Sequence, residues 1–194
     1  MNIGIFGGTF NPVHLGHIKA AELILAEFSF DRVIFVPVKD PVHKKFEGNA
    51  SPRDRLAMLE LAVEGKPFFS VDPIEIDRDE PSYTVHTLTA FKKKYPGSVL
   101  HLILGSDSFN TIDSWFDYIK VLELALFVVA VRPGDDGIRV DLLHTIPGII
   151  RPRSVFDNTS SSLVRQRVKE GLGIEGLVPE AVARYIKDKG LYLQ

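Results

Sequence analysis

The chain begins with the stretch NIGIFGGTFNPVHLGH, residues 2–17, which indicates a strand, a tight turn and the start of a helix. Residues 2–6 form a short β-rich run that stops at Gly7 and Gly8. Residues 15–28 then carry apolar side chains at loosely helical spacing. A strand followed at once by a helix is the repeating unit of α/β folds.

The rest of the chain continues this alternation. Further strands are expected at residues 32–37, 68–71, 99–104 and 126–131. Further helices are expected at residues 52–63 after an N-cap at Ser51, 85–94 after a cap at Thr84, 115–123, 160–169 and 179–187. The sequence therefore predicts a Rossmann-like α/β fold: a mostly parallel central sheet with helices on both faces, plus a C-terminal helical segment. A length of 194 residues fits one domain, residues 1–194.

Bulk composition narrows the class of protein. Apolar residues make up 45%, charged residues 25%, and the formal net charge is −2, so neither a nucleic-acid partner nor a membrane surface is indicated. The absence of cysteine excludes disulfides, thiolate nucleophiles and cysteine-bound metals. The first residues lack the features of a secretory signal, and the longest apolar run, 122–131, is too short to span a bilayer. We expect a cytoplasmic protein, and its oligomeric state stays open, a homo-oligomer included.

Parallel sheets bind ligands at the carboxyl ends of their strands, so the loops at residues 7–17, 105–107 and 132–134 are candidate site loops. In the first loop, glycines let backbone N–H groups approach a ligand, and the next helix adds its positive N-terminal end. His14 and His17 are three residues apart and share one helical face, while Gly16 between them leaves room for a bulky ligand. This combination predicts an anion site.

Other phosphate and metal motifs are absent from the same loop. It matches neither the P-loop pattern nor the G-x-G-x-x-G dinucleotide loop. A catalytic zinc ion would need a third ligand, which no H-E-x-x-H pattern supplies. No protein-bound metal is expected.

The string GGTFNPVHLGH resembles the H-x-G-H signature of the nucleotidyltransferase superfamily. Within that superfamily, the chain resembles the bacterial nicotinate-nucleotide adenylyltransferases along nearly its whole length. The supporting elements follow in order: PVKDPVHK at 37–44, SYT at 82–84 with TL at 87–88, GSD at 105–107 followed by Trp115, RPG at 132–134, SSSLVR at 160–165 and the C-terminal LVP, YI and GLY.

The resemblance implies a reaction in which the 5′-phosphate of nicotinate mononucleotide attacks the α-phosphorus of ATP. The products would be nicotinate adenine dinucleotide and pyrophosphate, in NAD biosynthesis. The nucleophile belongs to the substrate, so the protein would supply positioning and positive charge. A Mg²⁺ ion would arrive on the triphosphate and need few protein ligands.

The resemblance also assigns roles to residues. The catalytic group would consist of His14, His17, Lys44 and Arg165. ATP would be bound by Gly7, Gly8, Thr9, Phe10, Gly105, Asp107, Ser160 and Ser161. The acceptor would be bound by Lys39, Thr84, Trp115 and Arg132, with Trp115 stacking on the pyridine ring.

Simpler interpretations remain for several of these residues. Trp115 could be a core tryptophan, and Thr84 could be only a helix cap. The acids between residues 72 and 80 are expected to form a solvated loop, because their spacing matches no EF-hand.

Two classes of alternative function stay open. The same chemistry could act on nicotinamide mononucleotide, a phosphopantetheine or a cytidylyl acceptor, although His14 stands where phosphopantetheine enzymes carry threonine. A non-catalytic nucleotide sensor on the same fold is the other alternative. It would be expected to lack one of the four catalytic candidates.

Overall fold

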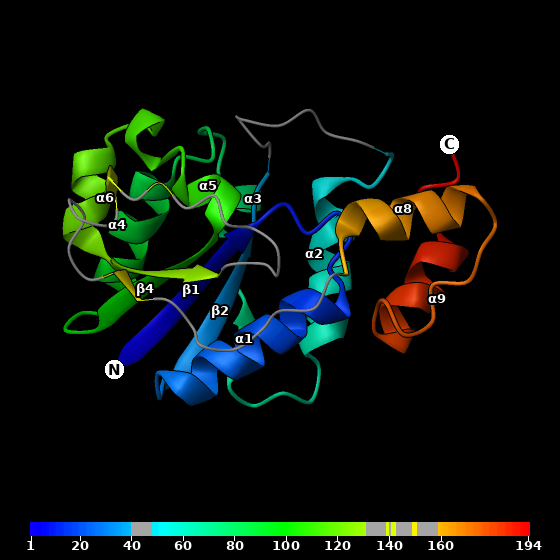
Figure 1. Cartoon of the computed structure of the whole chain (residues 1–194), viewed down its shortest axis with the longest axis horizontal. Helices are drawn as coiled ribbons and strands as arrows, with labels where there is room; N and C mark the ends of the chain where they lie inside the picture. Colours follow the sequence, from blue (N-terminus) through cyan, green and yellow to red (C-terminus); the bar gives the residue numbers. More distant parts are fainter. Residues whose placement is uncertain (40–47, 131–138, 140, 143–148, 151–158) are drawn as a thin grey trace.

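The computed structural model describes residues 1–39, 48–130, 139, 141–142, 149–150 and 159–194. Within these residues the strands form one sheet of six, in the order β3-β2-β1-β4-β5-β6, and every neighbouring pair is parallel. The strands are β1 (Asn2–Gly8), β2 (Arg32–Pro37), β3 (Phe69–Val71), β4 (Val99–Gly105), β5 (Leu126–Ala130) and β6 (Ile149–Ile150). The expected parallel α/β sheet is confirmed (Figure 1).

Helices follow the strands in alternation. They are α1 (Leu15–Glu27), α2 (Pro52–Val63), α3 (Ile74–Asp77), α4 (Thr84–Lys94), α5 (Ser106–Phe109), the 3₁₀ turn η1 (Ile112–Ser114), α6 (Tyr118–Leu124), α8 (Ser161–Lys169) and α9 (Glu180–Asp188). The predicted start of α2 is confirmed by a reciprocal cap. The Ser51 hydroxyl accepts the Asp54 N–H at 3.1 Å, and the Asp54 carboxylate accepts the Ser51 N–H at 2.9 Å.

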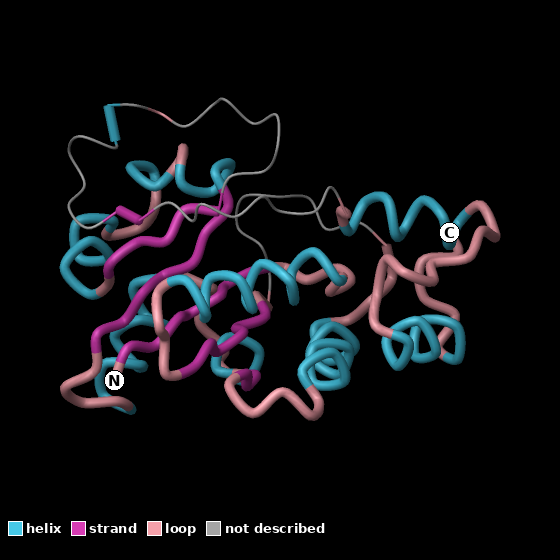
Figure 2. Tube along the Cα trace, turned by 60° about the horizontal axis from the view of Figure 1, so that its bottom comes forward, coloured by secondary structure: helices cyan, strands magenta, loops and turns pink. Residues whose placement is uncertain are grey.

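Helices cover both faces of the sheet, as Figure 2 shows. Side chains alternate along each strand, so Ile34 belongs to one buried cluster, with residues of α4, α5 and α6, while its neighbour Phe35 belongs to a second cluster, with residues of α1 and α2. Val164 of α8 and Val182 of α9 belong to the same buried cluster as Phe35. The predicted C-terminal helical segment therefore lies beyond α2 and extends one core (Figure 1).

Four helix starts differ from the prediction, those of α8 and α9 by one residue each. Thr84 is the first residue of α4, and Tyr83 precedes it as the N-cap without a side-chain capping bond, so the predicted cap at Thr84 is wrong. The helix expected at residues 115–123 begins only at Tyr118. Trp115 instead ends η1, and Asp117 adopts a left-handed conformation with φ 50°, which interrupts the helical path.

The sheet order places a change of direction between β1 and β4. From β1 the chain proceeds outward through β2 to β3, and from β4 it proceeds the other way through β5 to β6. Connections on the two sides leave a crevice at the carboxyl ends of β1 and β4. As for membrane association, none of the helices in the described ranges has the length and apolar character needed to cross a bilayer.

Candidate active site

A cavity of about 700 Å³ opens at the carboxyl ends of the central strands. Gly7 and Gly8 of β1, Gly105 of β4 and Ala130 of β5 all line it. Its position is the crevice between β1 and β4, where open α/β sheets bind their ligands.

Most residues that the sequence nominated meet in this cavity. Its wall contains Gly7, Gly8, Thr9, Phe10, His14, His17, Thr84, Gly105, Asp107, Trp115, Ser160, Ser161 and Arg165. Lys44 and Arg132 lie outside the described residues. Lys39 is described but does not line the cavity, because its Nζ donates to the Arg78 carbonyl at 2.8 Å and lies 3.6 Å from Asp79.

The two histidines stand together at the start of α1. Their ring centroids are 3.6 Å apart, and the His14 N–H donates to Nδ1 of His17 at 3.3 Å. Acceptance of this hydrogen bond by Nδ1 of His17 favours the tautomer that carries the ring proton on Nε2. Phe10 packs edge-on against His17 with 5.0 Å between ring centroids and restricts its orientation.

The glycines of this region have different tasks. A Cβ atom on Gly16 would lie 2.9 Å from Nδ1 of His14, so Gly16 makes room for the His14 ring. Gly16 also lines the cavity, so the expectation that it leaves room for a ligand stays a prediction. Gly7 also lines the cavity, and an added Cβ there would meet no atom within 4 Å. Gly7 thus borders open space at the cavity.

The N-terminus of α8 reaches the same cavity and is fastened to the loop after β1. Ser160 caps α8 by accepting the Leu163 N–H at 3.2 Å, as predicted for a helix that starts here. The Ser161 hydroxyl donates to the Pro12 carbonyl at 2.8 Å, and Nη1 of Arg165 donates to the Asn11 carbonyl at 2.9 Å. The N-terminal ends of α1 and α8 therefore converge, which concentrates backbone N–H groups and positive dipole ends in one place.

Aromatic side chains gather at another part of the cavity wall. Trp115 lines the cavity while its ring also packs partly against the core beneath α4 and α6, so the core interpretation and the site interpretation both hold in part. Tyr83 and Phe116 line the same region and stack with 4.6 Å between ring centroids. Thr84 lies beside them in the first turn of α4.

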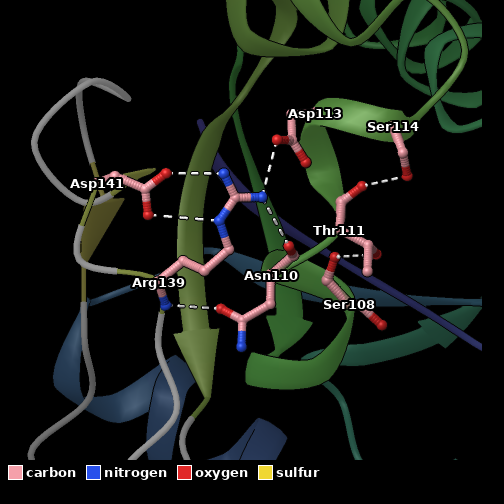
Figure 3. Close-up of polar contacts among 7 residues, drawn as sticks. All are labelled: Ser108, Asn110, Thr111, Asp113, Ser114, Arg139 and Asp141. Carbon is pink, nitrogen blue, oxygen red and sulfur yellow. Dashed lines mark hydrogen bonds and ion pairs between the residues drawn. The ribbon is translucent and has the colours of Figure 1, made fainter.

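An ion-pair cluster fastens the turn that leads to Trp115 (Figure 3). The backbone N–H of Arg139 donates to Oδ1 of Asn110 at 2.9 Å, and its guanidinium contacts Asp113 at 2.8 Å and Asp141 at 2.7 Å. The bond from Arg139 holds the pKa of Asp141 below its ordinary value. Arg139 is thereby bonded to the α5–η1 turn.

Arg55 and Glu75 are two of the residues in or around the site that sequence reasoning missed. Arg55 of α2 is fully buried, and its guanidinium donates to the carbonyls of Thr9 at 2.8 Å, Val38 at 2.6 Å and Lys39 at 2.8 Å. It joins the loop after β1 to the segment after β2. No local motif identifies such an arginine, because its partners are backbone atoms far away in the sequence.

Glu75 is the second missed residue. It lines the cavity with only 6% of its surface exposed and accepts the Thr87 hydroxyl hydrogen at 2.6 Å. Burial raises the pKa of its carboxyl group against the opposing effects of Thr87 and Arg78. The predicted solvated loop is wrong here and at Asp72, which is 9% exposed and pairs with Lys94 at 2.7 Å. Ile74 and Ile76, the apolar residues on either side of Glu75, were the one local sign that this segment is buried.

Comparison with known proteins agrees with this geometry. The family model described as cytidylyltransferase-like matches residues 5–167. The chain is 42% identical to a probable nicotinate-nucleotide adenylyltransferase of Desulfitobacterium hafniense (strain Y51), over 98% of this chain and 95% of that protein. It is 38% identical to one of Geobacter sulfurreducens, over 99% and 98% of the two chains.

A solved structure has the same fold. A Plasmodium falciparum nicotinic acid mononucleotide adenylyltransferase complexed with NaAD superposes with a TM-score of 0.81, over 98% of this chain and 97% of that chain, at 21% identity. The chain therefore belongs to the cytidylyltransferase-like family of nucleotidyltransferases and, within it, to the nicotinate-nucleotide adenylyltransferases.

Proposed function

We propose that this enzyme transfers the AMP part of ATP to nicotinate mononucleotide, giving nicotinate adenine dinucleotide and pyrophosphate. The observation that carries the proposal is that one cavity has two chemically different ends. One end has the paired histidines, Arg165 and two helix N-termini, which suit a triphosphate. The other end has Trp115, Tyr83 and Thr84, which suit an aromatic ring with an anionic substituent.

The chemical step needs no covalent intermediate on the protein. A 5′-phosphate oxygen of the acceptor forms a bond to the α-phosphorus of ATP, and the bond from that phosphorus to the pyrophosphate oxygen breaks. The electron pair leaves with pyrophosphate. The protein would hold both reactants in line and stabilise the charge that grows on the phosphoryl oxygens.

The histidine pair supports this step through hydrogen bonding. Nε2–H of His17 would donate to a phosphate oxygen, and His14, buried beside it, would complete the anion site at the end of α1. Arg165 and the first N–H groups of α8 would bind the β- and γ-phosphates. Lys44 is proposed on the family resemblance to neutralise further phosphate charge.

Magnesium fits this site as part of the substrate. In the described ranges no three His, Cys, Asp or Glu side chains are grouped to hold a metal ion. Asp107 supplies one carboxylate in the cavity wall, and Mg²⁺ bound to phosphates needs few protein ligands. Mg-ATP is therefore the proposed nucleotide substrate.

The acceptor would lie at the aromatic end. Trp115 would stack on the pyridine ring, and backbone N–H groups in the first turn of α4, beside Thr84, would attract its carboxylate. Asp107 in α5, directly after β4, would accept a hydrogen bond from a ribose hydroxyl of ATP. Lys39 and Arg132 are proposed for the acceptor on the resemblance alone, and residues 1–194 are proposed to act as one cytoplasmic domain.

The proposal is tested by product formation from Mg-ATP with the two pyridine mononucleotides in parallel. Dinucleotide and pyrophosphate should appear in equal amounts, with the acid turned over much faster than the amide. Comparable rates with both acceptors would show that the enzyme accepts the acid and the amide alike. No dinucleotide from either acceptor would overturn the acceptor assignment.

A further inference from the structure

Tyr192, close to the C-terminus, reaches back to the loop after β1. Its side chain is almost fully buried, and its hydroxyl donates to Oδ1 of Asn11 at 2.8 Å, across 181 positions of sequence. Its backbone N–H donates to Oδ1 of Asn49 at 2.8 Å. Asn11 lines the active-site cavity, but Tyr192 does not.

The same loop segment is held from its other side by α8. The Asn11 carbonyl accepts from Arg165 at 2.9 Å, and the adjoining Pro12 carbonyl accepts from Ser161 at 2.8 Å. Tyr192 therefore adds a further hydrogen bond to this segment, three residues before His14. Unlike Arg165 and Ser161, it contributes no atom to the cavity wall.

The backbone conformation of Tyr192 and the space around its ring are both restricted. Its φ is 65°, in the left-handed region that residues other than glycine seldom adopt and that persists only where the surroundings hold it. A Cβ atom on Gly48 would lie 2.8 Å from the Tyr192 ring, so a glycine there gives the ring its room. Burial raises the pKa of Tyr192, against the charges of Arg165 and Arg55, so the phenol keeps its proton and donates.

We propose that Tyr192 is a positioning residue for the ATP site, which acts through Asn11 to hold the β1–α1 loop where its N–H groups and His14 meet the triphosphate. This inference rests on the proposed function, because it concerns how that site is preorganised. A preorganised loop binds its ligand more tightly, since less freedom is lost on binding.

The test is Tyr192→Phe, with Tyr185→Phe as its matched control. Tyr185 lies on α9, and its hydroxyl donates to Asp54 at 2.9 Å, away from the cavity wall. Each variant therefore loses one phenol hydrogen bond of the C-terminal region. Tyr192→Phe should raise KM for ATP about threefold to tenfold, the range expected for one neutral hydrogen bond, and leave KM for nicotinate mononucleotide within about twofold.

Binding of a non-hydrolysable ATP analogue gives a readout that does not depend on turnover. Its Kd should rise by the same factor in Tyr192→Phe and stay unchanged in Tyr185→Phe. Equal values in the two variants, or an equal rise of KM for both substrates, would overturn the proposal. A wild-type enzyme that binds the analogue but makes no dinucleotide would refute the proposed function alone.

A double-mutant cycle tests the route through Asn11. In an Asn11→Ala background, Tyr192→Phe should cause almost no further loss of ATP affinity, because the bond between the two residues is already gone. A full, independent loss in that background would show that Tyr192 acts by some other path and would overturn the proposal.

Discussion

The imidazole rings of His14 and His17 lie almost face to face at the start of α1, with 3.6 Å between their centroids and 31° between their planes. The backbone bond from His14 to Nδ1 of His17 fixes this pair within the helix terminus itself. A binding group built into a helix start is already oriented before ligand arrives, and such preorganisation is a major source of catalytic stabilisation.

Replacement of His17 separates its two roles. Both His17→Asn and His17→Ala should lower kcat about 10²- to 10³-fold, because each removes the Nε2–H donor. Asn keeps an acceptor for the His14 N–H, so its melting temperature should stay closer to wild type than that of Ala. Steady-state kinetics and thermal unfolding measure the two effects. An alanine variant with kcat within about tenfold of wild type would exclude a catalytic role for His17.

Two glycine substitutions should fail for different reasons. Gly7→Ala places a methyl group in the open space beside the cavity, so KM for ATP should rise while the melting temperature is unchanged. Gly16→Ala forces the His14 ring aside, so kcat should fall. Steady-state kinetics should therefore show mainly a change in KM for Gly7→Ala and a change in kcat for Gly16→Ala, and calorimetry should show an unchanged melting temperature for Gly7→Ala. A Gly7→Ala enzyme with a lower melting temperature and an unchanged KM for ATP would contradict the prediction that the space beside Gly7 is used by the ligand.

Trp115 should matter for the acceptor and not for ATP. Trp115→Ala should raise KM for nicotinate mononucleotide about 5- to 160-fold, the effect of about 1–3 kcal/mol of base stacking. Trp115→Phe should recover much of this loss, because a ring remains. KM for ATP serves as the internal control in both variants. Equal losses for both substrates would indicate that Trp115 only supports the core.

Glu75 should make stability depend on pH. Its pKa is raised above the ordinary value of 4.5 by burial, so the protonated form stabilises the fold. That contribution is fully present below pH 4.5 and is lost as the pH rises through the pKa of the folded state. Glu75→Gln imitates the protonated form and keeps an acceptor for Thr87.

Urea unfolding at pH 5 and pH 8 measures this difference. The gain in unfolding free energy of Glu75→Gln over wild type should be larger at pH 8 than at pH 5. Thr111→Val, a change at an exposed hydroxyl that bonds only the Ser108 carbonyl among the described contacts, should show no such pH trend. A wild-type protein more stable than Glu75→Gln at pH 8 would mean that attraction to Arg78 outweighs burial.

The amino-acid sequence by itself determined the alternation of strands and helices and identified the loop at residues 7–17 as a candidate site loop. Apolar runs such as residues 32–37 and the Ser51 cap depend on neighbours in the chain, and the structure reproduces both. The paired histidines follow from a helical spacing of three residues, which needs no knowledge of the fold. Local signals of this kind are visible in one stretch of chain.

Only the tertiary structure decided which distant groups line the cavity or support the loops around it. Glu75 looks like one of several acids on a surface loop, yet packing against α4 buries it. Arg55 and Tyr192 contact the β1–α1 loop from positions 46 and 181 residues away, through atoms that no motif encodes. The physical reason is that burial and hydrogen bonds between remote segments arise when the sheet brings strand ends together, whereas periodicity and capping act over a few residues.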